Sequence, residues 1–140
     1  MICLTIDGAP EAKGRPRTFM VNGRPRILTP KKTRLYEDRV RCEALDAMGD
    51  KPMLEEAVSV VVTAYVAMPA SLKGKRRQDA IDGIIKPVTR PDVDNYAKVI
   101  DGLNGIVFKD DNLVTDLIVR KRYSERPRLV ITVEADTEFA

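Results

Sequence analysis

Hydrophobic and polar positions alternate along several segments of the chain, and this alternation predicts strands. Residues 2–6 are β-rich and alternate weakly, so they are expected to form an opening strand. Residues 56–68 are longer, rich in β-branched side chains and only partly alternating, which is typical of a strand in the centre of a sheet. Residues 113–123 and 127–134 are two further β-rich segments, and the short polar stretch between them predicts a hairpin.

Another hairpin is predicted near the N-terminus. Residues 17–20 and 25–28 flank the sequence Val-Asn-Gly-Arg, and Asn-Gly supports the positive φ angles that a tight hairpin turn requires. The long apolar segment at residues 58–68 is interrupted by polar side chains and is too short to cross a bilayer as a helix.

Three helical segments complete the predicted elements. Thr29 and Pro30 have the chemistry of an N-cap and a first helical position, so a helix is expected to start there and to end before Gly49. Residues 71–79 fit a short helix, and residues 94–103 fit another whose apolar side chains share one side. The order of elements predicts an α+β fold, a small mixed β-sheet with helices packed on it, in a single domain that comprises all 140 residues.

The composition is that of a folded cytoplasmic protein. With 44% apolar and 32% charged residues, the chain can bury a core and is too hydrophobic to stay disordered. Its start has no signal-peptide pattern. Cys3 and Cys42 are far apart and belong to no metal-binding motif, so we expect free thiols in a reducing compartment. The chain contains no histidine, which excludes Ser-His-Asp hydrolases and zinc sites built from imidazoles.

The net charge of +3 conceals a strong segregation of charge. The 25 residues from Ala12 to Tyr36 contain eight cations and no acid, and a second basic stretch lies between positions 73 and 90. Such clusters bind the phosphate backbone of nucleic acids through salt-sensitive contacts, whereas solubility alone does not require this bias. The predicted nucleic-acid-binding residues are Lys13, Arg15, Arg17, Arg24, Arg26, Lys31, Lys32, Lys73, Lys75, Arg76, Arg77, Lys86 and Arg90.

The candidate catalytic residues are two groups of acids and a lysine between them. Asp92 and Asp94 flank one residue, Lys98 follows at helical spacing, and Asp110 and Asp111 come about a dozen residues later. Carboxylates that converge without histidine or thiolate form a site for a hard cation, typically Mg²⁺. Without a cation they would repel one another and raise at least one pKa. An acidic metal site within a basic surface is what an enzyme that cuts nucleic-acid backbones requires.

Each of these residues also has a purely structural interpretation. Asp94 can be a helix N-cap, which contributes about 0.5–2 kcal/mol, with Asp92 as an ordinary loop residue. Lys98 lies four residues after Asp94, and the spacing alone favours an ion pair between them along one helix face. Asp110 and Asp111 follow a helix stop and have the composition of a turn. An EF-hand calcium loop is excluded, because the glycine and the glutamate that the motif requires are missing.

Four motifs together extend over nearly the whole chain. Pro-Asp-Val-Asp-Asn-Tyr-Ala-Lys stands at residues 91–98, and Leu-Asn-Gly-Ile-Val-Phe-Lys-Asp-Asp at residues 103–111. Lys-Gly-Arg-Pro-Arg at 13–17 and Thr-Pro-Lys-Lys-Thr-Arg-Leu-Tyr-Glu at 29–37 precede them. With these motifs the chain resembles the RusA family of Holliday junction resolvases, which are common in prophages. The resemblance implies a homodimeric, Mg²⁺-dependent endonuclease that nicks four-way DNA junctions symmetrically and leaves 5′-phosphate and 3′-hydroxyl ends.

The resemblance also implies roles for individual residues. The first two catalytic, metal-binding carboxylates of the family fall on Asp92 and Asp94, and its essential lysine falls on Lys98. The third carboxylate falls on the Asp-Asp pair, where Asp111 is the favoured catalytic ligand and Asp110 an assisting metal ligand. The basic residues would then hold the arms of a branched DNA by contacts to its backbone.

The predicted function is resolution of Holliday junctions in DNA recombination and repair. The expected cofactor is Mg²⁺, and the expected partners are branched DNA and a second copy of the chain, with no membrane and no small-molecule cofactor. Two alternatives stay open: a nuclease for flaps, forks or other branched DNA, and a non-catalytic DNA-binding accessory protein whose acids are caps and turns. The segment after Lys98 is one residue shorter than relatives lead us to expect, so no role is assigned to Asp101.

Overall fold

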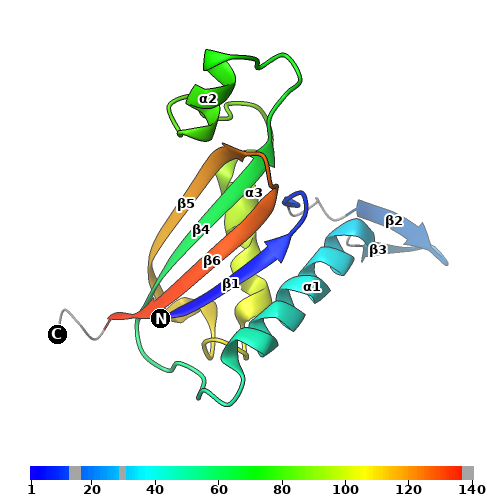
Figure 1. Ribbon diagram of the computed structural model, residues 1–140. Helices are drawn as coiled ribbons and strands as arrows, with labels where there is room; N and C mark the ends of the chain where they lie inside the picture. Colours follow the sequence, from blue (N-terminus) through cyan, green and yellow to red (C-terminus); the bar gives the residue numbers. More distant parts are fainter. Residues whose placement is uncertain (13–16, 29–30, 137–140) are drawn as a thin grey trace.

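The computed structural model describes residues 1–12, 17–28 and 31–136. Three strands come first in this part of the chain, β4 stands between α1 and α2, and two short 3₁₀ helices, η1 and η2, precede the last two strands (Figure 1). The elements are β1 (Ile2–Asp7), β2 (Arg17–Val21), β3 (Arg24–Leu28), α1 (Lys31–Met48), β4 (Val58–Ala67), α2 (Lys75–Ile81), α3 (Val93–Ala97), η1 (Lys98–Leu103), η2 (Asp111–Leu113), β5 (Val114–Ser124) and β6 (Arg128–Ala135).

Four of the strands form one sheet in the order β1-β6-β4-β5. The β1–β6 and β6–β4 pairs are antiparallel and the β4–β5 pair is parallel, so the predicted mixed sheet in an α+β fold is confirmed. The predicted hairpin between β5 and β6 is wrong, because β4 lies between them. The turn at residues 125–127 instead carries the chain past the end of β4. Alternation along a strand reports which side is buried but not which strand is its neighbour.

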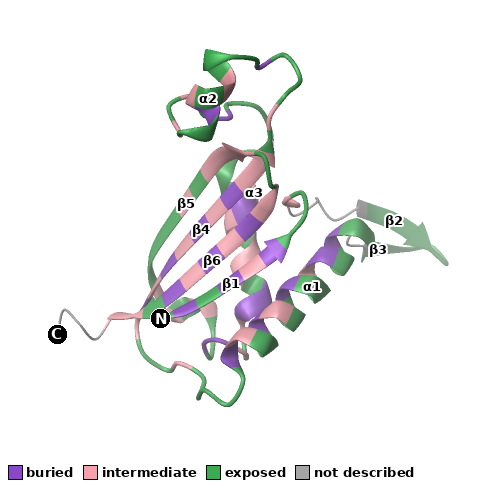
Figure 2. Ribbon diagram, in the orientation of Figure 1, coloured by how far each residue is buried: buried purple, intermediate pink, exposed green. Residues whose placement is uncertain are grey.

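The hydrophobic core lies on one face of this sheet. Alternate residues of β4, from Val58 to Ala64, are buried and contact the apolar sides of α1, α3 and η1 (Figure 2). Tyr96 and Leu103 enter the same core from α3 and η1, at 2% and 0% exposure. α1 passes η1 so closely that a Cβ on Gly102 would lie 3.0 Å from a methyl group of Val40, so a larger residue there would require Val40 to shift.

The observed bounds of the helices differ in part from the predicted ones. α1 ends at Met48 as predicted, and Gly49 follows with a positive φ of 51°. Its predicted start at residues 29–30 lies outside the described residues. The helix predicted at 94–103 is divided into α3 and η1, with a change from α to 3₁₀ geometry at Lys98. The predicted short helix at 71–79 is observed later, as α2 at Lys75–Ile81.

Two elements project from the body of the molecule. The predicted N-terminal hairpin is confirmed as β2 and β3, which pair only with each other and turn through Asn22 and Gly23 with positive φ angles of 51° and 75°. α2 follows β4 and extends beyond the same end of the sheet at which β1 ends (Figure 1). No helix in the described part of the chain is long and apolar enough to cross a membrane.

Candidate active site

Asp92 and Asp94 open the short helix α3. Asp92 is the N-cap, with extended backbone angles of −71° and 155°, yet its side chain makes no capping hydrogen bond. Asp94 lies in the first turn of the helix, and both residues are exposed. The alternative in which Asp94 is the N-cap is therefore not observed, and neither carboxylate is engaged in capping α3.

The loop in front of Asp92 is attached to the sheet by Lys121 of β5. The Lys121 ammonium donates hydrogen bonds to the carbonyl oxygens of Thr89, at 2.7 Å, and of Pro91, at 3.0 Å. Lys121 pairs with the buried Ala64 of β4, which places its side chain on the covered face of the sheet. Hydrogen bonds from a charged donor contribute about 1.5–3 kcal/mol each, so this contact fixes the loop in front of Asp92.

Lys98 and Asn95 connect two hollows on this side of the molecule. Lys98 borders a small pocket that Tyr36 and Asn95 also line. Asn95 in addition lines the open hollow beside Asp92, and its backbone N–H donates to the Asp92 carbonyl at 3.1 Å. Burial raises the pKa of Tyr36 to about 12, so this phenol stays protonated at neutral pH and is not a candidate general base.

The ion pair that the spacing of Asp94 and Lys98 favoured is not formed. Among the described residues no salt bridge joins the two side chains. The ammonium of Lys98 is therefore not neutralised by Asp94.

Asp111 belongs to a second acidic group. Desolvation raises the pKa of Asp111, and the neighbouring carboxyl groups of Asp110 and Asp101 raise it further. A carboxyl group with a raised pKa holds its proton more tightly in the folded chain than in the unfolded one. Its contribution to stability therefore falls as the pH increases through the interval between the unfolded and the folded pKa. Negative charge is concentrated where these three side chains meet.

The two acidic groups do not form one metal cluster in the described chain. Within residues 1–12, 17–28 and 31–136, no three acidic or thiol side chains are arranged to hold a metal ion. Asp92 and Asp110 border different hollows. The metal site predicted from Asp92, Asp94 and Asp111 thus stays a prediction, and the nearest carboxylate partners of Asp111 are Asp110 and Asp101.

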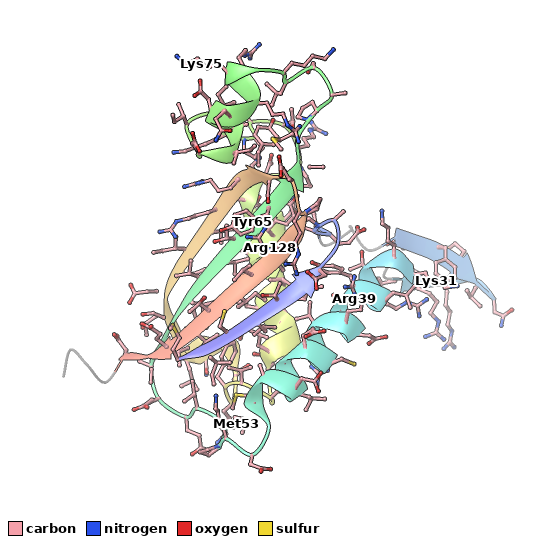
Figure 3. All side chains as sticks on the ribbon, in the orientation of Figure 1. Lys31, Arg39, Met53, Tyr65, Lys75 and Arg128 are labelled. Carbon is pink, nitrogen blue, oxygen red and sulfur yellow. The ribbon has the colours of Figure 1, made fainter. Side chains whose placement is uncertain are left out.

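The predicted basic residues fall on two separate projections. Arg24 and Arg26 are exposed on β3, and Lys31 lies beside this hairpin at the start of α1 (Figure 3). Lys32 follows it and contacts Glu11 at 3.3 Å. Lys13 and Arg15 lie outside the described residues, as does the side chain of Arg17.

The second projection carries the other basic stretch. Lys75, Arg76 and Arg77 belong to α2, and Figure 3 shows Lys75 on a different projection from Lys31. Arg77 contacts Glu125 at 3.3 Å, an exposed pair that contributes little to stability. Lys73, Lys86 and Arg90 lie in the loops around α2 and are exposed.

Two residues at the site were not predicted. Lys121 has a recognisable signal, because the alternation of β5 places a cation on the same side as Val119, towards the core, where it needs acceptors. Asp101 has a weaker signal, since its proximity to Asp111 depends on the turn between η1 and η2. Neither position belongs to the acidic motifs themselves.

Comparison with known proteins identifies the family of this chain. The family model described as endodeoxyribonuclease RusA matches residues 7–134. The chain belongs to the RusA endodeoxyribonuclease family. It is also similar to the uncharacterized protein YqaN of Bacillus subtilis (strain 168), with 39% identity over an alignment of 137 residues that covers 94% of each chain. The acids, Lys98 and both basic projections lie within the matched residues.

The contact made by Lys121 leads to a first prediction. Replacing Lys121 with Met removes both hydrogen bonds to the 89–91 loop, and we expect a loss of about 1–3 kcal/mol in unfolding free energy. Amide hydrogen exchange should increase in residues 89–96 more than in the rest of the sheet. Lys51→Met, at an exposed position far from the loop, is the control. Equal exchange in both variants would contradict the role of Lys121.

The charge coupling of Asp111 leads to a second prediction. Because the Asp101 carboxylate disfavours ionisation of Asp111, Asp101→Asn should lower the pKa of Asp111 towards its ordinary value. Carboxyl ¹³C chemical shifts followed over an acid titration measure this pKa directly. Asp116→Asn, a substitution of an exposed acid on β5, should leave it unchanged. An unchanged titration in Asp101→Asn would show that the two side chains are not coupled.

Proposed function

We propose that this protein is a Mg²⁺-dependent endonuclease that resolves four-way DNA junctions by paired symmetric nicks. Membership of an endodeoxyribonuclease family supports the nuclease activity. The observation that supports the assignment of the site is Asp92, an exposed N-cap whose carboxylate does no capping. A carboxylate that stabilises α3 would be expected to accept a hydrogen bond from its first turn.

Mg²⁺ is proposed as the cofactor, held by Asp92 and Asp94 with help from Asp111 and Asp110. The donors are all carboxylate oxygens, which fits a hard cation, and the accumulated charge around Asp111 fits the same cation. Bound there, the ion would activate a water molecule and stabilise charge on the scissile phosphate. Since the two acidic groups border different hollows, the proposal requires that metal and DNA draw them together.

Lys98 is proposed to add positive charge at the same phosphate. Its ammonium is exposed and makes no salt bridge with Asp94 in the described chain. Asn95, which lines the hollows of both Lys98 and Asp92, would keep the two in a fixed relation. Preorganised positive charge near a transferring phosphate contributes through electrostatic stabilisation of the transition state.

The two basic projections are proposed to hold separate arms of the branched DNA. The hairpin carries Phe19, Arg24 and Arg26 on one side, because these positions are paired or lie two apart in its register. Phe19 is 42% exposed, so an aromatic ring and two guanidinium groups are available to a nucleic acid. α2 and its loops provide a second basic surface on a separate projection.

The two alternatives predict different outcomes. A nuclease for flaps or forks would cut these substrates at least as fast as a four-way junction in a competition assay. A non-catalytic accessory protein would bind DNA without hydrolysing it, with or without Mg²⁺. The absence of capping by Asp92 argues against the accessory alternative, since that alternative assigns the acids to caps and turns.

Asp92→Asn provides the direct test of the site. The substitution preserves size and removes a charged metal ligand, so junction binding should persist while cleavage in Mg²⁺ falls by at least about 100-fold. Cleavage is measured by mapping nicks in a synthetic mobile four-way junction, with and without Mg²⁺. Asp50→Asn, at an exposed position outside the site, should cut like the unmodified protein. Undiminished cutting by Asp92→Asn would refute the ligand assignment.

The hairpin is tested by its salt dependence. Arg24→Ala combined with Arg26→Ala should weaken junction binding and make the slope of log K against log salt concentration less steep by about 2, about 1 for each phosphate contact. Fluorescence anisotropy with a labelled junction from low to moderate salt measures this slope. The control is Arg41→Ala combined with Lys51→Ala, two exposed cations outside the predicted DNA-binding set. The same slope in both double variants would exclude the hairpin from the DNA interface.

A further inference from the structure

The β2–β3 hairpin exposes apolar side chains that nothing in the described part of the chain covers. Met20 is 66% exposed and Ile27 is 76% exposed, and neither belongs to the hydrophobic core or packs against it. The hairpin pairs with no other strand and projects from the body of the molecule beside the start of α1 (Figure 1). Apolar side chains gathered on one exposed element mark a binding surface when no other part of the chain accounts for them.

The register of the hairpin divides its side chains between two faces. Thr18 pairs with Ile27 and Met20 pairs with Pro25, so these four residues point to the same side. All four are exposed and none carries a charge, and we refer to this side as the apolar face of the hairpin. The arginines of β3 point to the opposite side. The hairpin therefore has an uncharged face and a basic face back to back.

The stability of the hairpin does not account for the apolar face. A two-stranded hairpin has no second layer against which it could bury either side, so Met20 and Ile27 contribute little that an exposed threonine would not. Thr18 lies on the same face and shows that a polar β-former fits there. The two apolar side chains are better explained by an occupant outside the chain.

The charge of the hairpin indicates that this occupant is a polyanion. Arginine is the only charged residue type in residues 17–28, and Lys31 lies beside the hairpin at the start of α1 (Figure 3). Pro25 removes a backbone donor from β3, which makes the hairpin less suited to receive a strand from another protein. Nucleic acids combine phosphates with flat apolar surfaces, which are the faces of their bases. DNA therefore fits both sides of the hairpin.

The base of the hairpin lies at the candidate active site. Glu11 and Ala12 precede the hairpin and Thr33 follows it, and all three line the pocket that Lys98 borders. Lys32 contacts Glu11 at 3.3 Å, so the chain before the hairpin and the chain after it are close together at this point. DNA whose scissile phosphate lies at Lys98 consequently has the hairpin next to the position of the cut.

We propose that the apolar face of the hairpin inserts at the branch point of the DNA and packs on the base pair that ends one arm. The inference rests on the proposed function and deepens it, because it names the feature of the substrate that is recognised. In a continuous duplex each base pair is stacked on both sides, so insertion has to separate two stacked pairs. At a branch point the terminal pair of an arm is more easily separated from its neighbour, so insertion costs less there.

The basic face completes the contact. With the apolar face on the end of one arm, Arg24 and Arg26 point towards the backbone of the adjacent arm. The arginines contact phosphates of any DNA, whereas Met20 and Ile27 find an apolar partner only where bases are unstacked. The two faces therefore have separate roles, affinity for the backbone and selectivity for branched DNA.

Binding to matched DNAs tests the apolar face. Met20→Thr combined with Ile27→Thr retains the arginines and places β-formers at both positions, so the hairpin should fold normally. Affinity for a four-way junction, measured by fluorescence anisotropy without Mg²⁺, should fall at least about tenfold, because two buried apolar side chains are lost. Affinity for a linear duplex with the sequence of two of the arms should change by less than about twofold, because phosphate contacts are retained.

Two further double variants control this comparison. Leu45→Gln combined with Met53→Thr removes two exposed apolar side chains elsewhere and should bind both DNAs like the unmodified protein. Met20→Leu combined with Ile27→Val keeps the face apolar and should retain the preference for the junction. Circular dichroism verifies the fold of each variant. A threonine variant that loses affinity equally for junction and duplex, or for neither, would overturn the proposal, as would an equal loss in the Leu/Val variant.

A fluorescent base reports insertion directly. 2-Aminopurine brightens when it loses its stacking neighbour, so this base at the branch point should brighten when saturating unmodified protein is added without Mg²⁺. The threonine double variant should leave it unchanged at saturation, and 2-aminopurine in the middle of an arm should respond to neither protein. Unchanged fluorescence at the branch point with the unmodified protein would overturn the proposal.

The same readout separates this inference from the proposed function, because it requires no cutting. Brightening without any cleavage in Mg²⁺ would support insertion and refute the nuclease activity. Cleavage of the junction without brightening would overturn insertion and leave the proposed function intact. If the threonine double variant sediments differently from the unmodified protein in the absence of DNA, the apolar face belongs to a contact between protein chains and the proposal is overturned.

Discussion

The geometry of the site depends on the burial of Tyr96. α3 has five residues, far too few to form a stable helix alone, so its position is determined by what it contacts. Tyr96 is 2% exposed, and Leu103 at the end of η1 is fully buried. These two buried side chains hold α3 and η1 against the sheet. The two buried side chains therefore orient the exposed residues of this segment, including Asp92, Asp94 and Lys98.

The buried residues that stabilise the site differ from the exposed residues that are proposed to carry out its chemistry. Burial raises the pKa of Tyr96, with a smaller contribution from the charge of Glu11, so its phenol is a neutral structural group. Lys121 adds a second constraint. Its ammonium donates hydrogen bonds to two backbone carbonyl oxygens of the loop in front of Asp92, not to an acid. The exposed carboxylates contribute little to this framework. Replacing them is therefore expected to alter the site while leaving the core in place.

Much of the fold could be predicted from local patterns. Asn22-Gly23 specified the hairpin, and the β-branched segment around Val60 specified the central strand. The position of β5 could not be predicted, because the short turn at residues 125–127 suggests a hairpin while the sheet places β4 between its two arms. Neighbour relations of this kind depend on long-range packing, which a single alternating segment does not encode.

The candidate site, too, could be predicted only in part from local patterns. Its acids and lysine were visible as motifs, but the change from α to 3₁₀ geometry at Lys98 was not. The proximity of Asp101 to Asp111 likewise follows from the path of the chain after η1, which no local motif specifies.

The arrangement of charge suits the proposed function. The exposed cations are concentrated on the β2–β3 hairpin and around α2, on two separate projections, while the candidate acids belong to α3, η1, η2 and the residues next to them. Under the proposal, a DNA backbone held by both projections would be repelled by the carboxylates unless cations neutralise them. Metal binding and the close approach of the scissile phosphate would then reinforce each other. Such a coupling would give a physical reason for the two carboxylate groups to approach one another only when both metal and DNA are bound.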